Sequence, residues 1–158
     1  MSLPALVFKT SVIVEEGGLA KSVTVPAEAL FADPAVASEG DVSVGIEFSV
    51  GSDEILLEAS IAGGWRLGCG RCLVEHSVAY TTSAEETFPA EGSDIDLTET
   101  VREVALLELP QRSLCRPDCQ GLCESCGKNL NEGPCPCPPG KKPSGTSHPF
   151  VSLKHLKE

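Results

Sequence analysis

The sequence lacks the residues and motifs from which most active sites are built. Its three histidines, His76, His148 and His155, stand in no His-Glu-x-x-His or similar frame, and neither a Gly-rich phosphate loop nor a Gly-x-Ser-x-Gly elbow occurs. We therefore expect a protein that is not an enzyme and has no small-molecule substrate.

Long apolar runs are also absent. No stretch approaches the roughly 18–20 apolar residues that a membrane-spanning helix needs, and residues 1–9 lack the basic start of a signal peptide. We therefore expect a cytoplasmic protein without a membrane partner, in a compartment where thiols stay reduced.

Basic residues are scarce in the first 100 positions, which hold four of them against 17 acidic residues, a net charge of −13. Residues 101–158 hold eight basic against six acidic residues, a net charge of +2. Because affinity for RNA comes from Lys and Arg displacing counterions, an acidic body repels nucleic acid. RNA or partner contact is therefore expected from the tail, through Arg112, Arg116, Lys128, Lys141 and Lys142.

Apolar and polar residues alternate with period two over several segments, which predicts half-buried antiparallel strands. The clearest is 41–50, followed by a turn and a returning strand in which Gly63-Gly64 suggests a bulge or kink. The expected strands are 6–14, 20–25, 41–50, 55–67 and 76–88.

One main helix is expected over about residues 97–109, with Asp96 or Thr98 as its cap and Pro110 at its end. A shorter helical turn is expected over 27–31. The predicted fold is α+β and β-rich: an antiparallel sheet or partly closed barrel with this helix and a C-terminal zinc-knuckle tail.

Three regions are expected along the chain. Residues 1–110 form the acidic antiparallel β body with its helix, and residues 111–137 form a cysteine-rich, zinc-binding segment packed on it. Residues 138–158 form a linker rich in Pro, Gly and Lys and the C-terminal tail.

Six of the eight cysteines lie within the 23 residues of 115–137, and the other two form a lone Cys69-x-x-Cys72. Between these six, only Leu122 and Leu130 are large and apolar. Burying each is worth roughly 1.5–3 kcal/mol, whereas ordering each backbone residue costs roughly 1–2 kcal/mol. The segment therefore needs a covalent or coordinative constraint. Four disulfides and redox-active pairs are alternatives, but a reducing compartment favours bound metal.

Eight thiols suffice for two structural Zn²⁺ sites with four Cys ligands each. The order of the cysteines favours a partition in which consecutive pairs serve consecutive sites. The first site is then Cys69, Cys72, Cys115 and Cys119, and the second is Cys123, Cys126, Cys135 and Cys137. A rival partition joins the cysteines of 115–126 and sends Cys135 and Cys137 to Cys69 and Cys72, and a single bound metal is a third alternative.

Sites made only of cysteine are closed, which predicts a structural rather than a catalytic metal. Each Zn²⁺ with four thiolates carries a net charge of about −2. Arg71, Arg116 and Lys128 are close enough in the chain to compensate this charge.

Three motifs follow one another in a recognisable order. They are Cys69-Gly-Arg-Cys72-Leu73, the helix end Leu107-Glu-Leu-Pro110, and Leu114-Cys-Arg-Pro-Asp-Cys-Gln-Gly-Leu-Cys-Glu-Ser-Cys-Gly-Lys-Asn-Leu-Asn131. In this order they resemble the YceD family, the large ribosomal RNA subunit accumulation proteins, and the resemblance extends from about residue 41 to the end of the chain. It departs near Ser147-His-Pro-Phe150, where the family usually has an Asp-Pro-Arg-like turn.

The resemblance implies a part in the synthesis, processing or stability of precursor and mature large-subunit (23S) ribosomal RNA, in bacteria and plastids, with no enzymatic activity assigned. The implied partners are ribosomal RNA precursor, a ribosomal or RNA-processing protein, or both. From the charges we expect a basic protein to meet the acidic sheet, and RNA or a second partner to meet the tail. Two other classes stay open: a zinc-stabilised interaction adaptor unrelated to ribosomes, and a thiol or zinc redox sensor.

Overall fold

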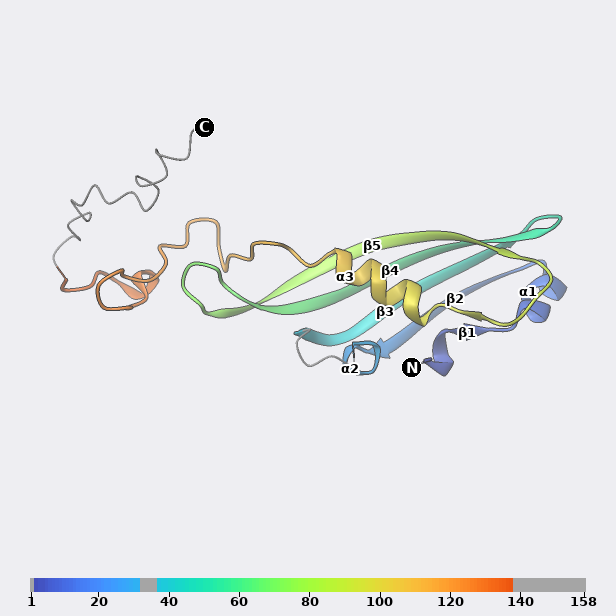
Figure 1. Cartoon of the computed structure of the whole chain (residues 1–158), viewed down its shortest axis with the longest axis horizontal. Helices are drawn as coiled ribbons and strands as arrows, with labels where there is room; N and C mark the ends of the chain where they lie inside the picture. The colour runs from blue at the N-terminus through green and yellow to red at the C-terminus, as the bar shows by residue number, and fades with distance from the viewer. Residues whose placement is uncertain (1, 32–36, 138–158) are drawn as a thin grey trace, which may run out of the picture.

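The fold is centred on a four-stranded antiparallel sheet (Figure 1). We describe it from a computed structural model, which defines residues 2–31 and 37–137. Each strand pairs with its neighbour in the chain, so the order across the sheet is β2 (Gly18–Pro26), β3 (Ser38–Val50), β4 (Glu54–Gly68) and β5 (Glu75–Pro89). A two-stranded sheet pairs β1 (Val7–Phe8) with β6 (Ile95–Asp96).

The four-stranded sheet is open within the described residues, because β2 and β5 are both edge strands. The predicted β-rich, antiparallel fold is therefore confirmed. Among the described residues the strands form an antiparallel sheet that does not close into a barrel.

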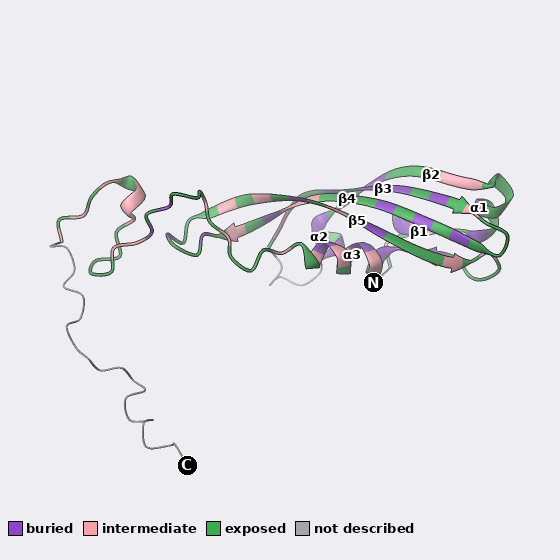
Figure 2. Cartoon of the chain, turned by 90° about the horizontal axis from the view of Figure 1, so that it is seen from above, coloured by how far each residue is buried: buried purple, intermediate pink, exposed green. Residues whose placement is uncertain are grey.

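One face of the sheet is buried beneath short helices, and buried and exposed residues alternate along the strands (Figure 2). The helices are α1 (Thr10–Glu16), α2 (Ala27–Leu30) and α3 (Thr98–Leu107), with a 3-10 turn η1 (Pro4–Leu6) before β1. None of the described helices is long and apolar enough to span a membrane. The largest fully buried side chains of the sheet are Trp65, Ile55, Leu57, Ile61, Val42 and Val44.

Of the strand expected over 6–14 only Val7–Phe8 is a strand, because Pro4–Leu6 forms the 3-10 turn η1 and Thr10–Glu16 forms helix α1. The helix directs Ile13 into the core and leaves Val12 39% and Val14 40% exposed. It ends at Gly17, whose φ of +71° allows the left-handed conformation of a helix C-terminus. The even positions Leu6, Phe8, Val12 and Val14 are apolar, which predicts a strand, but burial of Ile13 in the core outweighs this short pattern.

The bulge expected at Gly63-Gly64 lies instead on the partner strand, between Glu39 and Ser43 of β3. Gly63 has a different role, because a Cβ there would lie 2.5 Å from the hydroxyl oxygen of Tyr80. Because Gly63 has no side chain, the ring of Tyr80 can lie over the strand at this point and stack on Trp65, with 4.9 Å between the ring centroids.

Helix α3 leads the chain from the sheet to the cysteine segment. The backbone N–H of Thr98, its first residue, donates to Oδ1 of Asp96 at 2.9 Å, and the helix packs against β5. Leu107 is 82% exposed. After it the N–H groups of Glu108 and Leu109 each donate to the carbonyl three residues earlier, and the chain then reaches Pro110. The following segment runs beside the β4–β5 turn and continues beyond that end of the sheet, in orange in Figure 1.

Candidate metal centres

The turn between β4 and β5 carries the first two cysteines. The N–H of Cys69 donates to the carbonyl of Val74 at 2.9 Å, and the N–H of Leu73 donates back to the carbonyl of Cys69 at 2.9 Å. Leu73 adopts a positive φ of 62° to close this turn. The tight turn brings the side chains of Cys69 and Cys72 to the tip of the longest hairpin of the sheet.

The segment after α3 is held against this tip by specific hydrogen bonds. The N–H of Gly70 donates to the carbonyl of Ser113 at 2.8 Å, and the Ser113 hydroxyl lies 2.7 Å from Nε2 of His76. The guanidinium of Arg71 donates to the carbonyl of Cys119 at 3.0 Å. These contacts join two segments that lie more than 30 residues apart in the chain.

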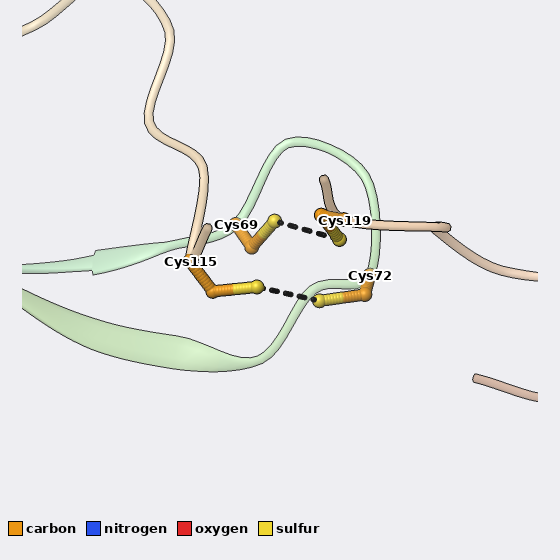
Figure 3. A group of neighbouring side chains, drawn as sticks. All are labelled: Cys69, Cys72, Cys115 and Cys119. Carbon is orange, nitrogen blue, oxygen red and sulfur yellow. Dashed lines mark hydrogen bonds between the residues drawn. The ribbon is translucent and has the colours of Figure 1, made fainter. Parts of the chain in front are cut away.

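Four thiols meet at this junction and form the first cluster, Cys69, Cys72, Cys115 and Cys119, whose sulfurs all lie within 4.8 Å of one another (Figure 3). The Sγ atoms of Cys69 and Cys119 are 3.8 Å apart, and those of Cys72 and Cys115 are 3.6 Å apart. All four are free thiols, and three of them are buried. A tetrahedral Zn²⁺ with Zn–S bonds of about 2.3 Å has sulfur–sulfur edges of about 3.8 Å, so the cluster has the size of a metal site.

The protonation of the first cluster also favours a cation. Backbone N–H groups of Cys115, Cys72 and Arg71 lower the pKa of Cys69 to about 5. Burial and then the Cys72 thiol raise the pKa of Cys115 to about 12. Four such thiols cannot all ionise side by side without a compensating charge, and a bound divalent metal would supply that charge.

The second cluster comprises Cys123, Cys126, Cys135 and Cys137, whose sulfurs also lie within 4.8 Å of one another. Its first half is a short loop in which the N–H of Gly127 donates to the carbonyl of Cys123 at 2.9 Å, with Gly127 at a φ of +71°. Backbone N–H groups of Cys126 and Ser125 lower the pKa of Cys123 to about 6. Cys126 is exposed, and the other three are partly buried.

Both clusters fit a tetrahedral metal through four soft sulfur ligands. A tetrahedral metal held by the four sulfurs of either cluster would have no coordination position left for water or substrate. The structure groups the thiols in the partition that the cysteine order favours, and the rival grouping of Cys135 and Cys137 with Cys69 and Cys72 is not seen.

The basic residues expected to contact RNA or a partner divide into three kinds. Arg116 pairs with Asp118 and donates to Oδ1 of Asn131, and Lys128 donates to the carbonyl of Pro134, so both support the cysteine segment while staying exposed. Arg112 is exposed and lines a groove of about 500 Å³ next to the first cluster. Lys141 and Lys142 lie outside the described residues.

Sequence reasoning missed Asn131, which connects the two clusters. Its side-chain N–H donates to Sγ of Cys119 at 3.3 Å, and this bond lowers the pKa of the Cys119 thiol. Asn131 lies in the 3-10 turn η2 (Leu130–Glu132), between the two pairs of the second cluster. In the sequence Asn131 stands as the last residue of the Leu114–Asn131 motif, and no contact to a cysteine was expected of it.

Sequence reasoning also missed how the acidic residues are arranged on the exposed face of the sheet. Glu47 of β3 lies directly opposite Glu58 of β4, which lies directly opposite Glu85 of β5. None of the three forms an ion pair with another described residue. This glutamate row borders a shallow hollow of about 600 Å³ that is otherwise lined mostly by small residues, including Ser22, Gly45, Ser60 and Ser83.

Comparison with known proteins places the cysteine segment in a family. The sequence profile described as "Large ribosomal RNA subunit accumulation protein YceD" matches residues 75–157, which is more than half of the chain. The match includes the six cysteines of 115–137 and begins after Cys69 and Cys72.

Similar curated proteins include two from plants and one from a bacterium. The "Large ribosomal RNA subunit accumulation protein YCED homolog 1, chloroplastic" of Zea mays is 42% identical over 53 residues, covering 33% of this chain and 18% of that protein. The protein of the same name in Arabidopsis thaliana is 36% identical over 71 residues, covering 45% and 21%. An uncharacterized protein of Mycobacterium bovis is 31% identical over 100 residues, covering 52% and 48%.

This chain therefore aligns with less than half the length of each of these relatives. No solved structure matches it. The family match covers β5, β6, helix α3 and the six cysteines of 115–137, and on this ground the chain belongs to the YceD family of large ribosomal RNA subunit accumulation proteins.

Proposed function

We propose that this protein is a non-enzymatic, zinc-stabilised factor that supports the accumulation of large-subunit (23S) ribosomal RNA in the cytoplasm. The observation that carries the proposal is the pair of closed four-cysteine clusters within and beside the family match. Such clusters build a rigid surface from a segment with few core residues, and they offer no open coordination position for chemistry.

Zinc is the metal we propose for both clusters. Tetrahedral sites with four thiolates are typical of structural Zn²⁺, whose ligation is worth about 10–16 kcal/mol in small peptides. That energy exceeds what Leu122 and Leu130, both partly buried, contribute to the segment. In the first cluster the metal fastens the chain after α3 to the β4–β5 turn, and in the second it closes the loop over 123–137.

The glutamate row and the exposed Arg112 support two kinds of partner. The glutamate row of Glu47, Glu58 and Glu85 suits a basic protein, since its charges have no partner among the described residues. Arg112 suits RNA phosphate, because it is exposed and forms no ion pair within the described part of the chain. The protein would then bridge ribosomal RNA and a ribosomal or RNA-processing protein.

A complementation experiment tests this function. A strain lacking the protein should recover large-subunit RNA when it carries the wild-type gene or the Glu91→Gln control, in which an exposed glutamate outside the sheet is neutralised. The Cys69→Ser/Cys72→Ser variant should leave the amount of mature RNA several-fold lower. Full recovery with the cysteine variant at normal protein level would contradict the proposal.

The exposure of Cys126 favours a redox sensor as the second candidate function. A zinc-bound thiolate that reaches solvent can be oxidised, which would release the metal. Counting zinc and free thiols per chain before and after mild peroxide separates the two candidates. Retained zinc excludes the sensor, whereas reversible release of one equivalent, with no RNA phenotype, favours it.

A pulldown at several salt concentrations tests the alternative that the protein is a zinc-stabilised interaction adaptor unrelated to ribosomes. If the wild-type protein captures neither ribosomal RNA nor ribosomal proteins at low salt, the direct form of the ribosomal function fails.

A further inference from the structure

One hydrogen bond crosses from the second cluster to the first. Asn131 stands five residues after Cys126 and four before Cys135, so its place in the chain is inside the loop that the second cluster closes. Its Nδ2 nevertheless donates to Sγ of Cys119 in the first cluster, at 3.3 Å.

The amide of Asn131 is held in one orientation by its other contacts. Its Oδ1 accepts from the backbone N–H of Gln120 and from Nη2 of Arg116, each at 2.8 Å. A flipped amide would turn its N–H₂ toward these two donors and its oxygen toward the sulfur. The Nδ2 also donates to Oδ1 of Asn129 at 2.8 Å, so both ends of the amide are fixed.

The backbone that carries Asn131 depends on the second cluster. The N–H of Cys123 donates to the carbonyl of Lys128 at 2.8 Å, and the N–H of Leu130 donates to the carbonyl of Gly121 at 2.9 Å. These bonds form a small antiparallel bridge between Leu122 and Asn129. Apolar packing is scarce here, so the loop needs its four thiols to be tied together to keep this shape.

We infer that Asn131 couples the two metal sites, so that metal in the second cluster increases the affinity of the first. With the loop closed, Asn131 donates to the thiolate of Cys119, which stabilises its negative charge and orients the sulfur toward the metal. With the loop open, that donor is lost. By linkage the coupling is reciprocal, so metal in the first cluster strengthens the second equally.

Cadmium binding to the full chain tests the coupling, because the two Cd²⁺ ions give separate ¹¹³Cd resonances that Cys69→Ser and Cys126→Ser variants assign. Competition with a chelator then gives the affinity of each site. The Asn131→Asp variant keeps an oxygen for Gln120 and Arg116 but places a carboxylate against Cys119. We expect it to weaken the first site about 10–100-fold. The Glu132→Gln control, on the same turn, should not.

A double-mutant cycle decides whether Asn131 carries the coupling. Cys126→Ser alone should weaken the first site by a similar factor, and Cys126→Ser combined with Asn131→Asp should weaken it little further. The inference is wrong if the double variant weakens the first site by the product of the two single factors. It is also wrong if Cys126→Ser leaves the affinity of the first site unchanged.

The coupling rests on the proposed function, in which both clusters bind metal, and the measurements distinguish loss of the coupling from loss of metal binding. A chain that binds two Cd²⁺ ions independently refutes only the coupling. A chain that binds no metal, in either Cd²⁺ or Zn²⁺, refutes the proposed zinc function itself. Circular dichroism of the sheet in each variant shows whether lost affinity comes from unfolding of the body.

Discussion

The guanidinium of Arg71 donates to the carbonyl oxygen of Cys119 at 3.0 Å, across 48 positions of the chain. The N–H of Arg71 also points at Sγ of Cys69, 3.5 Å away. One residue of the hairpin turn therefore positions ligands from both halves of the first cluster. The sequence suggested Arg71 as a counter-charge, whereas its side chain serves mainly as a hydrogen-bond donor to the backbone that carries a ligand.

Replacing Arg71 by alanine should weaken the first site about 10-fold, because outer hydrogen bonds that orient ligands typically contribute 10–100-fold to metal affinity. Chelator competition measures the change. Arg66→Ala is the matched control, since Arg66 is exposed and pairs with Glu39 away from the cysteines. Equal losses in the two variants would mean that net charge, not the contact with Cys119, is responsible.

Removing the metal should unfold the cysteine segment and leave the sheet folded. The core around Trp65 consists of apolar side chains of the sheet and helices and contains no cysteine of either cluster. After treatment with a chelator, amide hydrogen exchange should accelerate over 115–137, while the fluorescence of Trp65 stays that of a buried indole. Zinc, but not Mg²⁺, should restore protection. A simultaneous red shift of Trp65 emission would show that the sheet also depends on metal.

Metal content per chain should follow the grouping of the thiols. Wild-type protein should bind two equivalents by elemental analysis, and Cys69→Ser and Cys126→Ser should each bind about one, because each removes a ligand from a different cluster. Ser60→Ala, in the exposed face of the sheet, is a control that should retain two. One equivalent in the wild-type protein would contradict the two-site structure.

Neutralising the middle glutamate of the row should stabilise the protein. Glu58 has a like charge directly opposite on each side, Glu47 and Glu85, and such pairs are destabilising. Glu58→Gln should raise the free energy of unfolding by about 0.2–1 kcal/mol in urea, less at high salt. Glu54→Gln, opposite Pro89, should change it less. If the row binds a basic protein, Glu58→Gln should also weaken that binding, whereas unchanged binding would remove the row from the interface.

Gly63 should not tolerate a side chain. The Cβ of Gly63→Ala would lie 2.5 Å from the hydroxyl and 2.8 Å from the ring of Tyr80, so the variant should lose about 1–3 kcal/mol of stability. Gly68→Ala on the same strand is the matched control, because no atom lies within 4 Å of its Cβ position. Similar melting temperatures for the two variants would show that Tyr80 moves aside without cost.

The sequence by itself determined the strands of the main sheet and the chemistry of the site. Alternation over 41–50 and 76–88 is long enough to specify a half-buried strand, because side chains alternate between the two faces of a sheet. Eight cysteines in pairs, with few apolar residues between six of them, indicated a metal-held segment, since ligand type follows from residue type alone.

Only the tertiary structure decided how distant residues combine. Helix α1 forms where a short alternating pattern predicted a strand, because burial of Ile13 depends on what the rest of the chain places beside it. The row of Glu47, Glu58 and Glu85 depends on strand register, which one residue of slippage would destroy.

The grouping of the thiols and the contact of Asn131 with Cys119 likewise required the fold. Cys69 and Cys119 are 50 positions apart in the chain. Whether they meet depends on the lengths of β4 and β5 and on the path that the chain takes through α3 to Cys119. Chain order favours one grouping of the pairs but cannot exclude its rival, because both close loops of similar entropy. Hydrogen bonds such as those of Gly70 with Ser113 and Arg71 with Cys119 select the grouping that the structure shows.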